Sequence, residues 1–209
     1  MKKEQEDRAE AGRKKEGAKK IKADQEKIRA DQKEAAEDHE TEDSRQGRII
    51  SDQEIAEIIS ALRERGETVT TVESLTAGMI SARLADIPGC SDVMERAYVT
   101  YCDQAKHEMV KVKKKTLEKW TAVSRQCAKQ MAKGGAGQAG ACACVSATGY
   151  AGPPSGPEDR TAGLVYLGCH YRGETVTEEH HYAGQRNEVR AKAMNDALRL
   201  LYRMVIFSP

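Results

Sequence analysis

The sequence predicts an α/β protein, a three-layer α/β/α sandwich with a mixed sheet, that follows a charged N-terminal extension. Patterns typical of helices and of strands alternate through residues 50–209, which is the order expected of an α/β domain. Within residues 164–182, two strand-like runs flank a short turn with a glycine, which indicates an antiparallel hairpin and therefore a mixed sheet. Residues 1–49 show neither pattern and are predicted to be a separate low-complexity segment.

The extension differs from the rest of the chain in its charge. Of the first 50 residues, 14 are Lys or Arg and 14 are Asp or Glu, and none is aromatic. Such a segment buries too little apolar surface to offset the entropy of ordering, so we expect it to be disordered or a single solvated helix. A seven-residue repeat, in which Ala23–Lys27 resembles Ala30–Glu34, leaves open a helix that binds an unknown partner.

The overall composition excludes several classes of protein. The 209 residues contain 34 Lys and Arg against 33 Asp and Glu, so no excess charge points to nucleic acid or to an anionic membrane. No run approaches the roughly 18 apolar residues that span a bilayer, and the N-terminus lacks the apolar stretch of a secretory signal. We therefore expect a cytoplasmic protein with six reduced cysteines and with no nucleic-acid or membrane partner.

The first elements of the domain are predicted from capping signals and periodicity. Ser51 and Glu54 form a capping-box pattern ahead of apolar residues at helical spacing, and Gly66 ends that helix. The β-branched run 68–72 predicts a strand, and residues 76–85 predict a helix that stops before a Pro-Gly pair.

The remaining elements follow from the same signals. We predict strands over 97–101, 141–147, 164–171 and 175–182, and helices over 103–110, 124–133 and 186–205. The helix over 124–133 is expected to end at Gly134 and Gly135, and a lysine-rich run, 111–115, is expected to be a solvated turn.

Two segments at predicted strand ends could carry chemistry. In Glu73–Gly78, Ser74 lies near a helix N-terminus, where free N–H groups could hold a phosphate or an oxyanion, unless it simply caps the helix. In Tyr98–Lys106, a desolvated Lys106 could act as a base beside a serine. The plainer interpretation of this second segment is an exposed lysine and a half-buried tyrosine.

Two later segments give weaker signals. Ser146–Gly156 is a glycine-rich loop that would let the backbone approach a ligand, but it lacks a phosphate-binding P-loop pattern. Arg186 and Arg190 lie four residues apart at the start of the last helix and could present one face to an anion, or could be ordinary surface arginines. Neither the cysteine pair of the 141–147 strand nor the adjacent histidines near residue 180 has the spacing of a metal site.

Taken together and in order, these motifs resemble the CinA C-terminal domain, the nicotinamide-nucleotide amidohydrolase (NMN deamidase) family. The resemblance covers residues 55–202. It rests on E-S-L-T-A-G at 73–78, V-T-Y-C-D-Q-A-K at 99–106, A-V-S at 122–124 with M-A-K-G at 131–134, T-G-Y-A-G-P at 148–153, G-L-V at 163–165, and G-Q-R-N-E-V-R at 184–190.

The resemblance implies a hydrolase that converts nicotinamide mononucleotide to nicotinate mononucleotide and ammonia in pyridine-nucleotide recycling. Ser74 would be the nucleophile, Lys106 its general base as the neutral amine, and Tyr101 would assist proton transfer. Family resemblance also implies a substrate-binding set: Thr76, Gly78, Thr148, Gly152 and Arg186. It implies no metal and no cofactor, a small-molecule nucleotide as substrate, and a homo-oligomer.

The sequence departs from the family pattern at three positions. Gln104 replaces a usual Glu and Gln185 a usual Asp, so activity would be altered if those carboxylates orient Lys106 and Arg186. Ala162 replaces a usual proline. Two other functions stay open: a non-catalytic nucleotide-binding or regulatory domain linked to competence or DNA damage, and an interaction protein whose helical arm recruits a partner.

Overall fold

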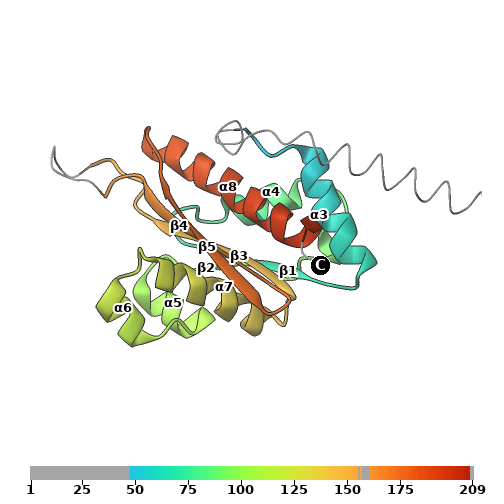
Figure 1. Cartoon of the computed structure of the whole chain (residues 1–209), viewed down its shortest axis with the longest axis horizontal. Coiled ribbons are helices and arrows are strands. Elements are labelled where there is room, and N and C mark those ends of the chain that lie inside the picture. The colour runs from blue at the N-terminus through green and yellow to red at the C-terminus, as the bar shows by residue number, and fades with distance from the viewer. Residues whose placement is uncertain (1–47, 155, 157–160, 208–209) are drawn as a thin grey trace, which may run out of the picture. The chain divides into compact units, whose positions relative to one another are not determined.

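The computed structural model describes residues 48–154, 156 and 161–207, so the predictions made for residues 1–47 lie outside the described residues. The described chain forms three layers around a central sheet (Figure 1). One face of the sheet carries α3 (Asp52–Glu64), α4 (Met79–Ala85) and α8 (Arg186–Phe207); the other carries α5 (Asp103–Val110), α6 (Lys114–Trp120) and α7 (Arg125–Ala139). The predicted α/β/α sandwich is confirmed.

The sheet has five strands in the order β2-β1-β3-β4-β5. In chain order they are β1 (Val69–Glu73), β2 (Tyr98–Val99), β3 (Ala143–Gly149), β4 (Leu164–Tyr171) and β5 (Glu174–His181). β1 pairs in parallel with β2 and β3, whereas β4 is antiparallel to both β3 and β5, so the sheet is mixed as predicted. The carboxyl ends of β1, β2 and β3 therefore meet at one edge, where parallel α/β sheets bind ligands.

The sheet is buried on both faces by two apolar clusters. Ala143, Val145 and Ala147 of β3 face the larger cluster with α3 and α8, while Cys144 faces the smaller one with α5 and α7. Burial on both sides explains why residues 143–145 of this strand are apolar without alternation. All six cysteines lie in the described residues, and each is a free thiol.

Several predicted boundaries are confirmed because local signals decide them. The capping box at the start of α3 is formed, since the Ser51 hydroxyl accepts from the Glu54 N–H and the Glu54 carboxylate accepts from the Ser51 N–H. The bounds of α5 agree with the sequence. The hairpin turn uses Arg172 and Gly173, whose φ angles of 46° and 91° are those of a tight two-residue turn.

Four predictions about the elements were wrong. The lysine-rich run does not form a simple turn, because α6 begins at Lys114 within it. The helix predicted from 76 begins only at Met79, since Ala77 and Gly78 have φ angles of 50° and 99°. The strand predicted over 97–101 is reduced to the two residues of β2.

The end of α7 is the clearest correction. The helix continues through both glycines to Ala139 and is capped by Gly140, whose φ is 67°. A Cβ on Gly134 would lie 1.8 Å from the carbonyl oxygen of Val110, and one on Gly135 would lie 2.3 Å from a methyl carbon of Val72. The two glycines therefore allow α7 to pack against α5 and β1, and they do not end the helix.

In the described part of the chain, helices are all too short or too polar to cross a lipid bilayer.

Candidate active site

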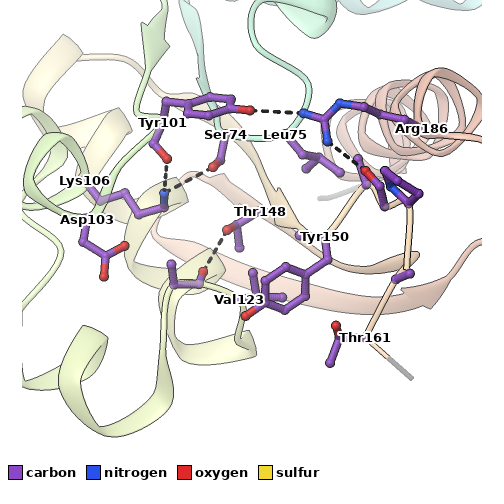
Figure 2. A pocket seen from close by; sticks show the side chains of 16 residues that line it. Ser74, Leu75, Tyr101, Asp103, Lys106, Val123, Thr148, Tyr150, Thr161 and Arg186 are labelled. Carbon is purple, nitrogen blue, oxygen red and sulfur yellow. Dashed lines mark hydrogen bonds between the residues drawn. The ribbon is translucent and has the colours of Figure 1, made fainter. Parts of the chain in front are cut away.

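A pocket of about 370 Å³ lies at the edge where the parallel strands end (Figure 2). Its walls come from segments far apart in sequence: Ser74 follows β1, Tyr101 and Lys106 follow β2, residues 148–153 are the end of β3 and the loop after it, and Arg186 begins α8. A volume of this size is in the range of small-molecule sites. The sheet order thus brings together most of the side chains singled out from the sequence.

Ser74 and Lys106 form the centre of the pocket. The Lys106 Nζ lies 3.2 Å from the Ser74 Oγ and 3.5 Å from the Tyr101 carbonyl oxygen (Figure 2). It also lies 2.9 Å from the carbonyl oxygen of Thr100. Lys106 is only 1% exposed and Ser74 9% exposed. A lysine so deeply buried has little water around it, and its contacts are with uncharged oxygens.

Burial lowers the pKa of Lys106 from its usual value, because the charged ammonium loses its hydration. Cys127, Asp103 and Cys102 oppose this shift and do not cancel it. Burial also raises the pKa of the Cys127 thiol to about 12, so near neutral pH this side chain is an uncharged thiol. A neutral amine at hydrogen-bond distance from a hydroxyl can remove its proton, which is the requirement for an activated serine.

Glu73 fixes the loop that carries Ser74, residues 74–78, here called the Ser74 loop. Its carboxylate is fully buried and accepts hydrogen bonds from the N–H groups of Gly78, Ile80 and Ser81, at 2.8, 3.1 and 2.9 Å. These are the N–H groups that the first turn of a helix leaves without partners. Glu73 therefore caps α4, and those N–H groups are not free to bind a ligand.

Two other N–H groups of the Ser74 loop remain available. In the described structure, the N–H groups of Leu75 and Thr76 have no hydrogen-bond acceptor, whereas the Ser74 N–H donates to the Ala147 carbonyl at 3.0 Å. Backbone N–H groups directly after a nucleophile are well placed to stabilise the oxyanion of a tetrahedral intermediate. The hydroxyl of Thr76 is also buried without a partner among the described residues.

Tyr101 and Arg186 form a second pair in the same pocket. Arg186 donates to the Tyr101 hydroxyl at 3.2 Å and to the Gly152 carbonyl at 2.9 Å (Figure 2). Tyr101 is 61% exposed, and its hydroxyl makes no hydrogen bond with Ser74 or Lys106. Of the implied catalytic set, the structure therefore joins Ser74 to Lys106 directly and holds the Tyr101 hydroxyl toward Arg186.

The implied substrate-binding residues divide into two groups. Thr148, Gly152 and Arg186 line the pocket, and the Thr148 hydroxyl donates to the Ala122 carbonyl at 2.8 Å. Thr76 and Gly78 do not line it: Thr76 is fully buried, and the Gly78 N–H is used by the Glu73 carboxylate.

The two glutamines that depart from the family pattern lie outside the Ser74–Lys106 contact. The Gln104 side chain donates to Glu108 at 2.8 Å and is exposed on α5. Gln185 precedes α8, and its backbone N–H donates to the Glu188 carboxylate at 2.7 Å. In this structure, neither position contacts Lys106 or the Arg186 guanidinium through its side chain.

Sequence reasoning missed the functions of Glu73 and Arg190. Arg190 does not present a free face to an anion beside Arg186, because its guanidinium donates to the Leu75 and Thr76 carbonyls and to Asn187. A signal for Glu73 was present, since an acidic residue directly after a β-branched buried strand needs buried donors. No comparable signal identified Arg190, whose partners are 114 and 115 residues away.

Histidine, cysteine and acidic side chains in the described residues do not gather in any group of three that could hold a metal ion.

The fold and the pocket define an α/β domain with a buried Ser–Lys pair at the carboxyl edge of a mixed sheet. A family model described as the CinA C-terminal domain matches residues 52–205. The chain therefore belongs to the CinA C-terminal domain family.

Curated relatives and solved structures agree with this assignment. A Clostridium botulinum (strain 657 / Type Ba4) protein, named as a competence-damage inducible protein, is 40% identical over 146 residues, 70% of this chain and 36% of that protein. A Clostridium novyi (strain NT) relative of the same name is 42% identical over 139 residues, 66% of this chain and 34% of that protein. The chain thus spans about a third of the length of these curated relatives.

The match to each of two solved structures extends over nearly the whole length of that structure. The crystal structure of the competence damage-inducible protein A from Klebsiella pneumoniae is 35% identical with a TM-score of 0.68, over 73% of this chain and 94% of that chain. The structure of competence/damage inducible protein CihA from Agrobacterium tumefaciens is 36% identical with a TM-score of 0.68, over 74% of this chain and 96% of that chain.

Proposed function

We propose that this domain hydrolyses the carboxamide of nicotinamide mononucleotide, giving nicotinate mononucleotide and ammonia. The observation that supports this most directly is the 3.2 Å contact between the Lys106 Nζ and the Ser74 Oγ inside a ligand-sized pocket. The lowered pKa of Lys106 favours the neutral amine that a general base requires. The names of the relatives do not state this activity, and the family resemblance supplies the substrate.

In the proposed reaction, the Ser74 Oγ attacks the carboxamide carbon while its proton passes to the Lys106 Nζ. The oxyanion would be stabilised by the N–H groups of Leu75 and Thr76, which are free in the described structure. The Lys106 ammonium then gives its proton to the leaving nitrogen, and ammonia departs from an ester of Ser74. Water, deprotonated by Lys106, attacks this ester, and the nicotinate carboxylate leaves as Ser74 regains its proton.

Arg186 and Tyr101 would bind the part of the nucleotide outside the carboxamide. Arg186 carries a fixed positive charge at the pocket wall, where it suits a phosphate group. The Tyr101 hydroxyl is held by Arg186, so a part in proton transfer would require the tyrosine ring to turn toward Ser74 when substrate binds. Thr148 would contact the substrate from the end of β3, and Gly152 from the loop that follows.

The test is ammonia release from nicotinamide mononucleotide by the purified protein, comparing the wild type with Ser74→Ala and Lys106→Met. We expect both substitutions to remove turnover and to leave the fold intact, because each removes an atom of the reacting pair. Ser60→Ala on α3 and Lys129→Ala on α7 are matched controls on other helices and should keep wild-type turnover. Full turnover by Ser74→Ala would contradict the proposal. A well-folded wild type that releases no ammonia but binds the nucleotide would favour a binding or regulatory domain.

A further inference from the structure

Arg190 is a cation beside the pocket, and the proposed reaction assigns no role to its contacts. From α8, its Nε donates to the Leu75 carbonyl at 2.8 Å, and its Nη2 donates to the Thr76 carbonyl at 3.2 Å. Its Nη1 donates to the Asn187 side chain at 3.1 Å. One guanidinium therefore holds the two residues that follow Ser74, from a position 115 residues away in the sequence.

These contacts determine where the N–H groups of the Ser74 loop point. A peptide unit is planar and trans, so the N–H of Thr76 points opposite to the Leu75 carbonyl that Arg190 binds. That N–H is one of the two without an acceptor in the described structure. By the same rule, the Thr76 carbonyl sets the direction of the Ala77 N–H, which donates to the Ser74 carbonyl at 3.2 Å.

The conformation of the Ser74 loop requires stabilisation by hydrogen bonds from outside the loop. Ala77 has a φ of 50°, in the left-handed region that a residue with a Cβ adopts at a cost of about 1 kcal/mol or more. Glu73 anchors the α4 end of the loop through Gly78, and Arg190 anchors its middle. A guanidinium has a rigid fork of N–H groups that can reach two carbonyls at once, whereas a lysine offers a single flexible ammonium.

We propose that Arg190 is a positioning residue, which orients the Thr76 N–H as an oxyanion donor by holding the Leu75 and Thr76 carbonyls. This inference rests on the proposed function, in which Ser74 is the nucleophile. Arg190 is not among the residues that line the pocket, and it makes no hydrogen bond with Ser74 or Lys106 in the described structure. Its effect is therefore on the transition state, where the oxyanion exists, and not on nucleotide affinity.

The experiment compares Arg190→Ala and Arg190→Lys with the wild type and with Lys192→Ala. Lys192 is a matched control, because it is an exposed cation of the same helix that also donates to a backbone carbonyl, that of Ala183, at 2.7 Å. With nicotinamide mononucleotide, we expect kcat of Arg190→Ala to fall by about 10- to 100-fold and KM to stay within about threefold. Arg190→Lys should recover only a small part of kcat, added methylguanidinium should restore part of kcat to Arg190→Ala, and Lys192→Ala should match the wild type.

A second measurement separates this proposal from the choice of substrate. A small alkyl fluorophosphonate bonds to the Ser74 Oγ as fluoride leaves, and its phosphoryl oxygen occupies the oxyanion position. Mass spectrometry gives the rate of this labelling without any nucleotide. We expect slower labelling in both Arg190 variants.

The outcomes are distinct. A wild type that labels but does not release ammonia, with slow labelling in the Arg190 variants, contradicts the proposed substrate and supports the positioning role. Wild-type kcat and labelling in Arg190→Lys, or a rise in KM alone, would overturn the positioning role even if Arg190→Ala fails to fold. An unlabelled wild type would overturn both proposals.

Discussion

At the scale of single residues, the protonation state of Lys106 controls the proposed chemistry. A lysine in water has a pKa near 10.4, so at neutral pH it is almost entirely charged and cannot act as a base. Burial lowers the pKa of Lys106, and the nearby Asp103 carboxylate opposes that shift. Asp103 begins α5, and the structure places it in the same pocket wall. The sequence alone indicated that a desolvated lysine could act as a base, but its depth and its partners come from the fold.

This leads to a prediction about pH. Because the neutral amine is the active form, kcat/KM should rise as the pH rises through the pKa of Lys106, below the usual lysine value. Asp103→Asn removes a charge that raises this pKa, so the acid side of the profile should move to lower pH. Glu108→Gln changes a carboxylate of the same helix that does not shift the pKa of Lys106, and its profile should match the wild type. A profile that moves to higher pH in Asp103→Asn would exclude Lys106 as the base.

At the scale of elements, the close packing of α7 explains its glycines. Gly134 faces the Val110 carbonyl of α5, and the nearest atom to an added Cβ would lie at 1.8 Å. Three residues later, Gly137 is exposed in the same helix, and an added Cβ would meet nothing within 4 Å. The two positions therefore have the same helical backbone and opposite surroundings.

We expect Gly134→Ala to destabilise the domain by about 2 kcal/mol or more, because α5 or α7 must move. Gly137→Ala should stabilise it by about 0.5–1 kcal/mol, since alanine has the higher helix propensity. Urea unfolding of the two variants and the wild type measures both free energies. A free energy of unfolding for Gly134→Ala equal to that of the wild type would show that the contact between α5 and α7 is not rigid.

The same contrast separates the elements that could be predicted from those that could not. The start of α3 and the whole of α5 depend on caps and periodicity within a few residues, so the sequence is sufficient to locate them. The end of α7 depends on contacts with Val110 and Val72, which are far away in the chain. The length of β2, two residues, depends on its pairing with β1, which no local pattern specifies.

At the scale of the whole molecule, the site is a product of sheet order. Ser74 follows β1, Lys106 lies on α5 after β2, and Thr148 lies at the end of β3. They meet because β1 lies between β2 and β3 and is parallel to both. The sequence motifs predicted this set only through the family resemblance, since strand order is not encoded in any single segment. The same applies to Arg190, whose contacts with the Ser74 loop depend on how α8 packs beside α4. A homo-oligomer stays a prediction.

The extension provides the last prediction. Ile50 belongs to the packed core of the domain, since it is 1% exposed and its N–H donates to the Asn195 side chain at 2.6 Å. Deleting residues 1–47, which keeps Arg48 and the buried Ile50, should leave ammonia release and the melting temperature close to those of the full chain. Deleting residues 1–50 should cost about 2–3 kcal/mol, because a buried isoleucine and its hydrogen bond are lost. Thermal unfolding and turnover of the two truncations measure this difference, and loss of turnover in the shorter deletion would mean that the extension takes part in the reaction.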